Sequence, residues 1–235
     1  MDDAGTTTPS PRLPDWNRVL VVVAHPDDES FGLGAVVDVL TSGGSQVHVL
    51  CLTEGESSTL GAGINLGRMR RDELTQASRE LGVAQAVLHH HPDGSLSTVC
   101  RHVLAGEVID ELGAVRAEGI LVFDDTGVTG HPDHAAATAA ALLAADVLDL
   151  PVLAWTLPAP VAEQMNSELG VKAFSGVAPE DIDYSIEVDR THQVNASRAH
   201  HTQAVPDSPL WRRLELLGDR EHLRWLRRPG TMTSA

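Results

Sequence analysis

The amino-acid sequence predicts an α/β fold: a mostly parallel sheet with helices on both faces, formed as a single domain. Short runs of β-branched and other apolar residues alternate with longer segments of helical periodicity. This alternation is the order expected of a parallel sheet whose strands are connected by helices. The chain has 235 residues, which is enough to bury a full hydrophobic core.

The predicted strands are apolar on both faces, as strands buried inside a parallel sheet are. They are residues 18–24, 46–53, 84–89, 119–123 and 151–157. After them the pattern is less regular, and residues 181–188 alternate as a half-exposed strand does.

Helices are predicted between these strands, at residues 30–41, 66–81, 101–117 and 132–147. Glycines follow the first two, where a residue of positive φ commonly ends a helix. Two polar helices, at 190–203 and 209–227, complete the chain. The amphipathic segment 211–225 is interpreted as a packed surface helix, with a subunit contact in a homo-oligomer as the alternative.

These elements predict a Rossmann-like domain over residues 16–227. Residues 1–15 and 228–235 are polar and rich in Pro, Gly, Ser and Thr, and are predicted to be a disordered N-terminal tail and a C-terminal tail.

Charge and composition exclude several classes of partner. The formal net charge is −16, and phosphate contacts need clustered Lys and Arg, so no nucleic-acid surface is expected. The longest apolar run, 135–145, is far shorter than the ~20 residues of a membrane-spanning helix, and the start lacks a signal segment. Cys51 lies in an apolar run and is interpreted as a core thiol in a reducing compartment. We therefore expect a soluble cytoplasmic protein without a membrane partner.

The first predicted strand ends in His25-Pro26-Asp27-Asp28-Glu29. A His and an Asp three positions apart at a strand-to-helix turn can face one point, which leaves Asp27 free to contact a metal-bound water. The alternative is structural: Asp28 or Ser30 caps a helix, and His25 is solvated.

A second polar segment, DDTGVTGHPDH at residues 124–134, follows the strand predicted at 119–123. His131 and His134 again lie three positions apart, and Pro132 suits the first position of a helix. Helix capping and dipole stabilisation by Asp133 is the alternative. Because ligands bind at the carboxyl ends of parallel strands, two His-Pro-Asp units at two strand ends indicate a site rather than two caps.

The two His-Pro-Asp segments together supply the histidines and carboxylates of a metal site. Two His and one carboxylate leave a metal an open position for water, which is the arrangement of catalytic zinc. The same set suits non-haem Fe(II), so Zn²⁺ is predicted with Fe²⁺ as the alternative. The run 89–91 of three histidines also lies at a strand end; either one of them lines the cleft or all three are exposed.

The chain resembles the LmbE-like (PIG-L) N-acetylglucosamine deacetylases. The motifs that carry the resemblance are AHPDDE at 24–29, LTEG at 52–55, RxxExxxAxxxLG at 70–82, PDGxL at 92–96, GHPDH at 130–134 and AHxTQ at 199–203. The resemblance covers about residues 18–203.

The resemblance implies that His25, Asp28 and His134 bind zinc and that Asp27 acts as general base. It implies that His131 is the protonated partner of the oxyanion, held in orientation by Asp133.

For substrate contacts, the resemblance implies Arg70 and Asp93, and His200 of the last motif is placed with them. Family members that act in low-molecular-weight thiol metabolism often carry a Tyr at the position of Thr129. This chain departs from that pattern at a residue expected to contribute to the fit of the substrate.

The function implied is that of a metal-dependent hydrolase that removes an N-acetyl group from a small-molecule amino sugar. One alternative is an amidase that cleaves a larger acyl group from a glucosaminyl-inositol, mycothiol-type conjugate. A metal- or sugar-binding module without catalysis is another, although it would need neither Asp27 nor His131. An Fe(II) redox enzyme is the last.

Overall fold

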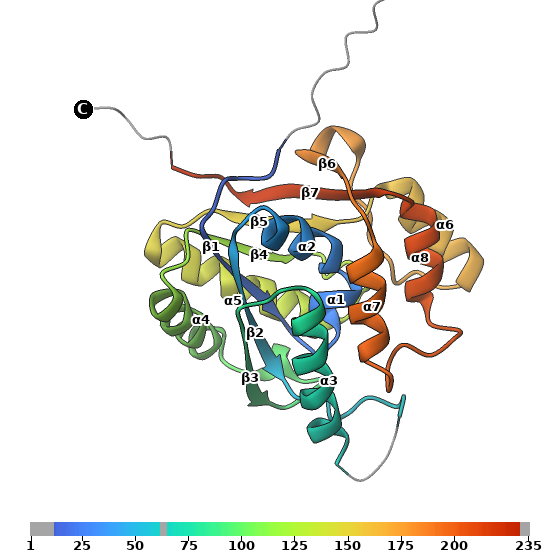
Figure 1. Ribbon diagram of the computed structural model, residues 1–235, viewed down its shortest axis with the longest axis horizontal. Coiled ribbons are helices and arrows are strands. Elements are labelled where there is room, and N and C mark those ends of the chain that lie inside the picture. The colour runs from blue at the N-terminus through green and yellow to red at the C-terminus, as the bar shows by residue number, and fades with distance from the viewer. Residues whose placement is uncertain (1–11, 62–64, 231–235) are drawn as a thin grey trace, which may run out of the picture.

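The computed structural model describes residues 12–61 and 65–230. Its sheet has seven strands in the order β3-β2-β1-β4-β5-β7-β6 (Figure 1). The strands are β1 (Arg18–Val23), β2 (Gln46–Thr53), β3 (Gln85–His91), β4 (Gly119–Phe123), β5 (Val152–Thr156), β6 (Tyr184–Glu187) and β7 (Arg220–Arg227). The first five are parallel, and β7 runs antiparallel to both β5 and β6.

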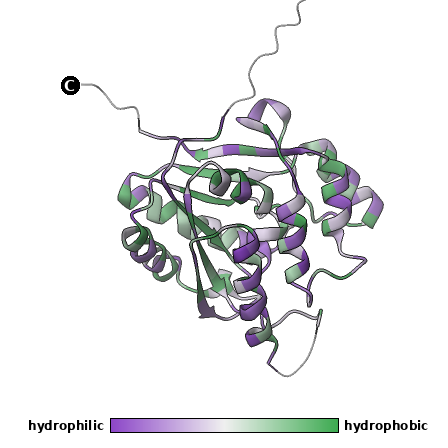
Figure 2. Ribbon diagram, in the orientation of Figure 1, coloured by the Kyte–Doolittle hydropathy of each residue, from purple (hydrophilic) through white to green (hydrophobic). Residues whose placement is uncertain are grey.

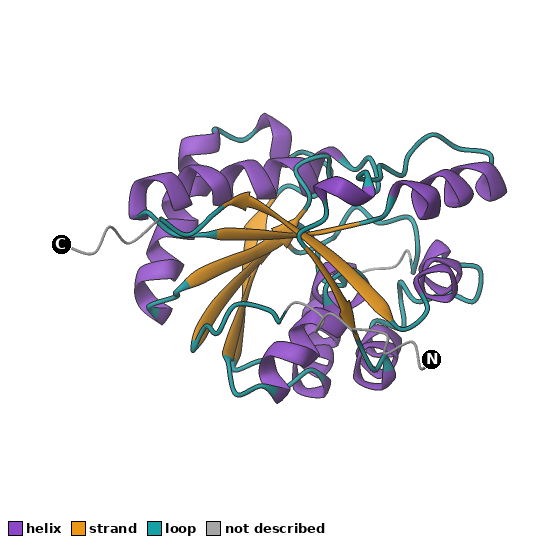
Figure 3. Cartoon of the chain, turned by 90° about the horizontal axis from the view of Figure 1, so that it is seen from above, coloured by secondary structure: helices purple, strands orange, loops and turns teal. Residues whose placement is uncertain are grey.

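Helices cover both faces of the sheet (Figure 3). They are α1 (Asp28–Phe31), α2 (Gly34–Ser42), α3 (Leu66–Glu80), α4 (Arg101–Val115), α5 (Pro132–Leu148), α6 (Ala159–Leu169), α7 (Thr191–Ala199) and α8 (Pro209–Leu217), with short 3₁₀ turns at Leu96–Thr98 and Pro179–Asp181.

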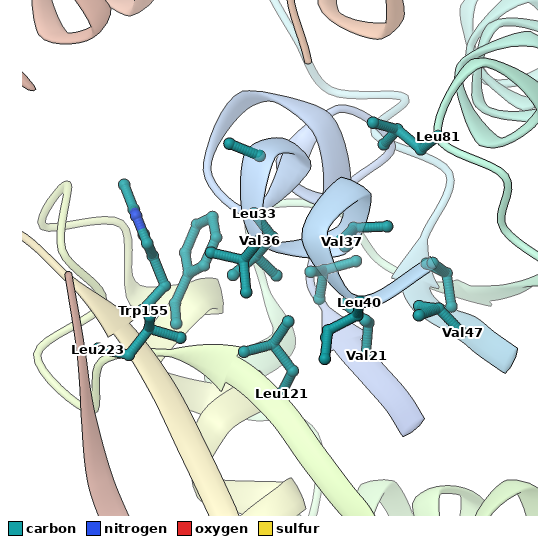
Figure 4. Close-up of a cluster of buried hydrophobic side chains, with 14 of the residues drawn as sticks. Val21, Leu33, Val36, Val37, Leu40, Val47, Leu81, Leu121, Trp155 and Leu223 are labelled. Atoms are coloured by element: carbon teal, nitrogen blue, oxygen red, sulfur yellow. The ribbon is translucent and has the colours of Figure 1, made fainter. Parts of the chain in front are cut away.

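Alternate residues of each parallel strand face two separate cores. Val21 of β1 packs in the core under α2, α3 and α7, whereas its neighbour Val22 packs in the core under α4 and α5. Figure 4 shows Val21 and Leu121 beneath Val36 of α2. Burial of each such side chain contributes about 1.5–3 kcal/mol. Because both faces are covered, the central parallel strands are largely hydrophobic in Figure 2, whereas β7 carries both hydrophilic and hydrophobic residues.

The predicted fold class is confirmed, but the predicted helix at 30–41 is two helices. The chain breaks at Gly32, where an added Cβ would lie 2.4 Å from the Phe123 ring. The helix α6 was not predicted.

The helix predicted at 209–227, interpreted as a packed surface helix over 211–225, is correct only for its first part, α8, and is wrong from Gly218 onward. Gly218, with a φ of 58°, ends α8, and the next residues form β7 in the interior of the sheet. Glu221 and Leu223, two positions apart on this strand, are both buried. The burial of alternate residues in the sheet therefore determined the structure of this segment, and the helical spacing of its apolar residues did not.

The predicted tails fall largely on residues 1–11 and 231–235, which lie outside the described residues. Both cysteines are free thiols, and Cys51 is buried. Across the described ranges, no helix combines the length and apolar character needed to cross a membrane.

Candidate active site

The candidate site is a cavity of about 450 Å³ at the carboxyl ends of the parallel strands. Its volume falls in the range of small-molecule pockets. The side chains in its wall that the sequence singled out are those of His25, Asp27, Asp28, Arg70, Asp93, Thr129, His131 and His134. The segment 57–60, Phe31, Gly32, Gly94, Phe123, Gln203 and Arg213 complete the wall.

The turn after β1 places Asp27 and Asp28 in the cavity. Asp28 Oδ2 accepts the backbone N–H groups of Ala24 and His25, at 3.2 and 2.9 Å, which fixes the carboxylate over the strand end. Asp27 has a φ of 134°, a conformation that costs a non-glycine residue of order 1–3 kcal/mol. Such strain persists where the surrounding contacts over-determine it, as at functional sites.

A tight loop after β4 places the two later histidines. Gly127, Val128 and Gly130 all have positive φ, of 76°, 59° and 72°. This curled backbone turns the Gly127 carbonyl toward His134, whose Nδ1 lies 3.1 Å from it. The loop therefore fixes the orientation of the His134 ring through a contact at Nδ1.

The three predicted metal ligands lie together. Asp28 is the central group: its Oδ1 lies 3.1 Å from His134 Nε2 and its Oδ2 lies 3.4 Å from His25 Nδ1. One ring nitrogen from each of His25, His131 and His134 also lies within 4.8 Å of the others. His131 is thus near enough to belong to the same centre.

The hydrogen bonds of His134 fit a metal ligand. Since Nδ1 donates to the Gly127 carbonyl, the neutral ring has a lone pair on Nε2. In this neutral form the lone pair faces the carboxylate oxygen of Asp28 at 3.1 Å, whereas a protonated ring donates to that oxygen. A cation between the neutral ring and the carboxylate satisfies both, and a carbonyl behind a ligating His is the usual supporting contact.

His25 is surrounded by carboxylates. Its Nε2 lies 3.2 Å from Asp93 Oδ1 and 3.5 Å from Asp133 Oδ2. Burial acts to lower the pKa of His25, but hydrogen bonding to Asp133 and Asp28 outweighs it and holds the pKa well above its usual range. Burial acts to raise the pKa of Asp28, and the neighbouring His134 more than reverses this. The centre therefore concentrates negative charge around its histidines.

Asp27 is set apart from this centre by its contact with Arg70. Arg70 Nη2 lies 3.0 Å from Asp27 Oδ2 and also donates to the Pro26 carbonyl, while Nη1 donates to the Gly55 carbonyl. Burial raises the pKa of Asp27 to about 6, although Arg70 acts to lower it. A carboxylate with a pKa near neutrality is suited to accept and return a proton.

The predicted pairing of Asp133 with His131 differs from the structure. The Asp133 carboxylate accepts the N–H groups of Gly94 and Leu96, at 2.8 and 3.0 Å, and faces His25. His131 Nδ1 instead accepts the backbone N–H of Asp133, at 3.3 Å. Burial and the positive charge of nearby histidines lower the pKa of His131, which favours a neutral ring rather than the expected imidazolium.

The four predicted substrate contacts separate into two groups. Asp93 and Thr129 lie in the cavity wall, where Asp93 Oδ2 accepts the N–H of Ser57 and Thr129 Oγ1 lies 3.0 Å from His134 Nδ1. Arg70 also lines the cavity, but its guanidinium is engaged by the protein. His200 is fully buried and is not part of the wall.

His200 belongs to a buried chain of contacts that the sequence did not reveal. Its Nε2 lies 2.7 Å from Glu29 Oε1, and Glu29 Oε2 accepts the backbone N–H of Asp27 at 2.9 Å. Glu29 is fully buried, and its presence in the first motif was the only signal. These contacts connect α7 to the strained turn.

Other residues of the wall were also missed. Ser58 Oγ donates to Gln203 Oε1 at 2.8 Å, which joins the segment after β2 to the end of α7. Arg213 of α8 lies over the Trp155 ring, with Cζ 5.0 Å from its centroid. Gln203 belongs to the AHxTQ motif but was given no role, and no motif contains Ser58 or Arg213.

Comparison with known proteins agrees with this arrangement of motifs. Residues 20–145 match the family model described as GlcNAc-PI de-N-acetylase, PIG-L. That match spans both the turn after β1 and the loop after β4. The chain belongs to the PIG-L family. The family and the enzyme class expected from the sequence, a deacetylase that hydrolyses a linear amide, are thereby confirmed.

A PIG-L relative from Streptomyces avermitilis, named 1D-myo-inositol 2-acetamido-2-deoxy-alpha-D-glucopyranoside deacetylase, is 30% identical over 253 residues. The match covers 84% of this chain and 86% of the relative.

Solved structures share the fold. N,N'-diacetylchitobiose deacetylase from Pyrococcus horikoshii aligns with a TM-score of 0.65 at 21% identity, over 93% of this chain and 88% of that one. The 4-carboxy-2-hydroxymuconate hydratase GalB from Pseudomonas putida aligns with a TM-score of 0.67 at 18% identity, over 93% and 100%. Since a deacetylase and a hydratase share the PIG-L fold, the reaction must be argued from the side chains.

Proposed function

We propose that this protein removes the N-acetyl group from a GlcNAc-containing small molecule, with a metal ion held by His25, Asp28 and His134. The Streptomyces avermitilis and Pyrococcus horikoshii proteins are both named as deacetylases of acetylated amino sugars. The observation that carries the proposal is the position of Asp27. It adjoins the ligand set, lines the cavity and has a pKa of about 6.

The ligand set favours zinc. One carboxylate and two imidazoles suit Zn²⁺ and leave a position for an exchangeable ligand, while Fe²⁺ is the alternative for the same set. When bound, the ion supplies Lewis-acid activation of the attacking water and of the amide carbonyl.

Asp27 accepts the proton of the attacking water. Its carboxylate is oriented by Arg70 on one side, and its backbone is held by Glu29 on the other. A positioned base of matched pKa contributes about 10²- to 10⁴-fold to the rate. After attack, Asp27 carries this proton and returns it to the amide nitrogen as the C–N bond breaks, so the same side chain serves as base and then as acid.

His131 donates a hydrogen bond to the carbonyl oxygen as that oxygen becomes negative. Because its Nδ1 accepts the Asp133 N–H, the hydrogen of the neutral ring is on Nε2. A donor fixed in this way before the reaction needs no reorganisation at the transition state. Asp133 acts through His25, which its carboxylate faces, and through the backbone of the segment that carries Asp93.

The test is release of acetate by the purified, zinc-loaded protein. The substrates are GlcNAc-inositol, N,N'-diacetylchitobiose and free GlcNAc, with a glucosaminyl-inositol thiol conjugate to test the amidase alternative. We expect acetate and a free amine in equal amounts from at least one acetylated sugar. If only the thiol conjugate is hydrolysed, the protein is an amidase and the deacetylase proposal is wrong. A metal-loaded protein inactive on the whole panel would contradict both.

Metal identity needs a separate measurement. Metal content after purification without oxygen, and activity after reconstitution with Zn²⁺ or Fe²⁺, distinguish the two ions. We expect zinc to restore activity in air, whereas an Fe²⁺ enzyme would lose activity on oxidation.

A further inference from the structure

A second cluster of potential metal ligands lies between β3 and α4. His89 and His91 are two positions apart on β3 and therefore point to the same face of the sheet, toward Glu107 of α4. His90, between them, points to the opposite face and pairs with Glu54. None of these residues lines the active-site cavity. We call His89, His91 and Glu107 the β3–α4 cluster.

Both imidazoles of the cluster are directed at one carboxylate oxygen. His89 Nδ1 lies 2.8 Å and His91 Nε2 lies 2.7 Å from Glu107 Oε2. The ligand atoms of all three side chains lie within 4.8 Å of one another. Their side chains are 25, 18 and 28% exposed, so each is partly held by its surroundings and remains open to solvent on one side.

Simple ion pairing explains this arrangement poorly. Partly exposed ion pairs of this kind contribute about 0–1 kcal/mol each to stability. A histidine forms such an ion pair with Glu107 only when its ring is protonated. Two neutral imidazole nitrogens and a carboxylate, converging from a strand and a helix, are instead the donor set of a zinc site with an open position. The adjoining surface pocket, of about 470 Å³, gives solvent access to that position.

We propose that the β3–α4 cluster binds a divalent transition-metal ion of the zinc type at a site separate from the active site. His89 supplies Nδ1, His91 supplies Nε2 and Glu107 supplies a carboxylate oxygen, with water completing the tetrahedron. The proposal does not depend on the deacetylase function, because none of its three residues takes part in that reaction.

A metal ion in the β3–α4 cluster would affect the structure at the edge of the sheet. β3 is the edge strand of the sheet and has a strand neighbour, β2, on one side only. A metal ion held by β3 and α4 would attach this edge to the helix layer beneath it. Asp93, which enters the active-site wall, follows His91 by two residues, so the bound ion would also stabilise the base of that segment.

The experiment measures bound Zn²⁺ by equilibrium dialysis at one fixed free Zn²⁺ concentration. The wild-type protein is compared with His91→Ala, Glu107→Gln and His90→Ala. His90→Ala is the matched control, because it removes a histidine from the same run but from the opposite face. The number of Zn²⁺ ions bound by each variant is subtracted from the number bound by the wild type. This difference does not depend on how many ions the active site holds.

We expect His91→Ala and Glu107→Gln to bind one equivalent less than the wild type, and His90→Ala to bind as much as the wild type. Glu107→Gln is nearly isosteric and guards against misfolding, and a metal-free melting curve verifies that each variant is folded. Zn²⁺ should raise the melting temperature of the wild type more than that of Glu107→Gln. Equal binding by all four proteins, or the same loss in His90→Ala, would overturn the proposal.

Discussion

Arg70 holds Asp27 in place from the wall of the cavity, with Nη2 of the guanidinium 3.0 Å from Oδ2 of the carboxylate. The same guanidinium donates to the carbonyls of Gly55 and Pro26, at 2.7 and 2.6 Å. An added Cβ at Gly55 would lie 2.1 Å from Arg70 Nη1, so the glycine is needed for this close approach. We therefore interpret Arg70 as a residue that positions Asp27, although the resemblance implied a sugar contact.

Replacement of Arg70 by Lys should lower kcat by about 10- to 100-fold, as loss of a supporting contact to a reactive group does, with little change in KM. Because the charge of Arg70 lowers the pKa of Asp27, its removal in Arg70→Gln, but not in Arg70→Lys, should also move the acid limb of the pH–rate profile to higher pH. Steady-state kinetics across pH measure both effects. A raised KM with an unchanged kcat would restore the sugar-binding role.

Asp27→Ala should lower turnover about 100-fold or more and leave the metal bound, since Asp27 is not among the proposed ligands. The strained backbone adds a second expectation. At an ordinary position Gly is less stable than Ala by about 0.5–1 kcal/mol, but a φ of 134° reverses this order. Asp27→Gly should therefore be as inactive as Asp27→Ala and more stable by about 1 kcal/mol. Urea unfolding of both variants, beside assays of activity and metal content, tests this pair.

The parallel part of the fold was predictable because its strands are apolar on both faces. β7 was not, because its burial depends on partners distant in the chain. Trp155 Nε1 donates to Glu221, and Arg224 pairs with Asp124, 100 residues away. In the local sequence, these charged residues favour a solvent-exposed helix face. The partners that neutralise their charges come close only when the chain is folded.

The same distinction applies to the site. His25 and Asp28 were predictable as a pair because their three-residue spacing at a strand end places them together locally. The orientation of the Asp133 carboxylate toward His25, and the burial of His200 against Glu29, depend on contacts across more than 100 residues. A motif names such residues but does not determine which neighbour each one faces.

His134→Ala should remove one equivalent of metal relative to the parent protein and abolish acetate release. His102→Ala is the matched control, because His102 is an exposed histidine of α4 with no place in the cavity. Chelation of the parent protein should have the same effect on activity, reversed by added Zn²⁺. Unchanged metal content in His134→Ala would remove it from the ligand set.

The contact between Asp124 and Arg224 predicts how stability depends on pH. Asp124 is fully buried at the end of β4, and Arg224 of β7 donates to it. Burial acts to raise the pKa of Asp124, but the hydrogen bond from Arg224 outweighs it and lowers the pKa. A folded-state pKa below the ordinary value of about 3.9 stabilises the protein above that pH, and the contribution is lost as the pH falls through the folded value.

Asp124→Asn should therefore lower the free energy of unfolding by about 2 kcal/mol at neutral pH, because Arg224 loses its buried partner and keeps only the exposed carboxylate of Asp125. The difference from the wild type should shrink below about pH 4, where the wild-type carboxylate is itself protonated. Asp125→Asn is the matched control: Asp125 contacts the same arginine but is 54% exposed, so its loss should cost under about 0.5 kcal/mol. Urea denaturation at several pH values measures these differences. An effect of Asp124→Asn that is constant from pH 7 to pH 3 would show that packing, and not charge, holds β7 to the end of β4.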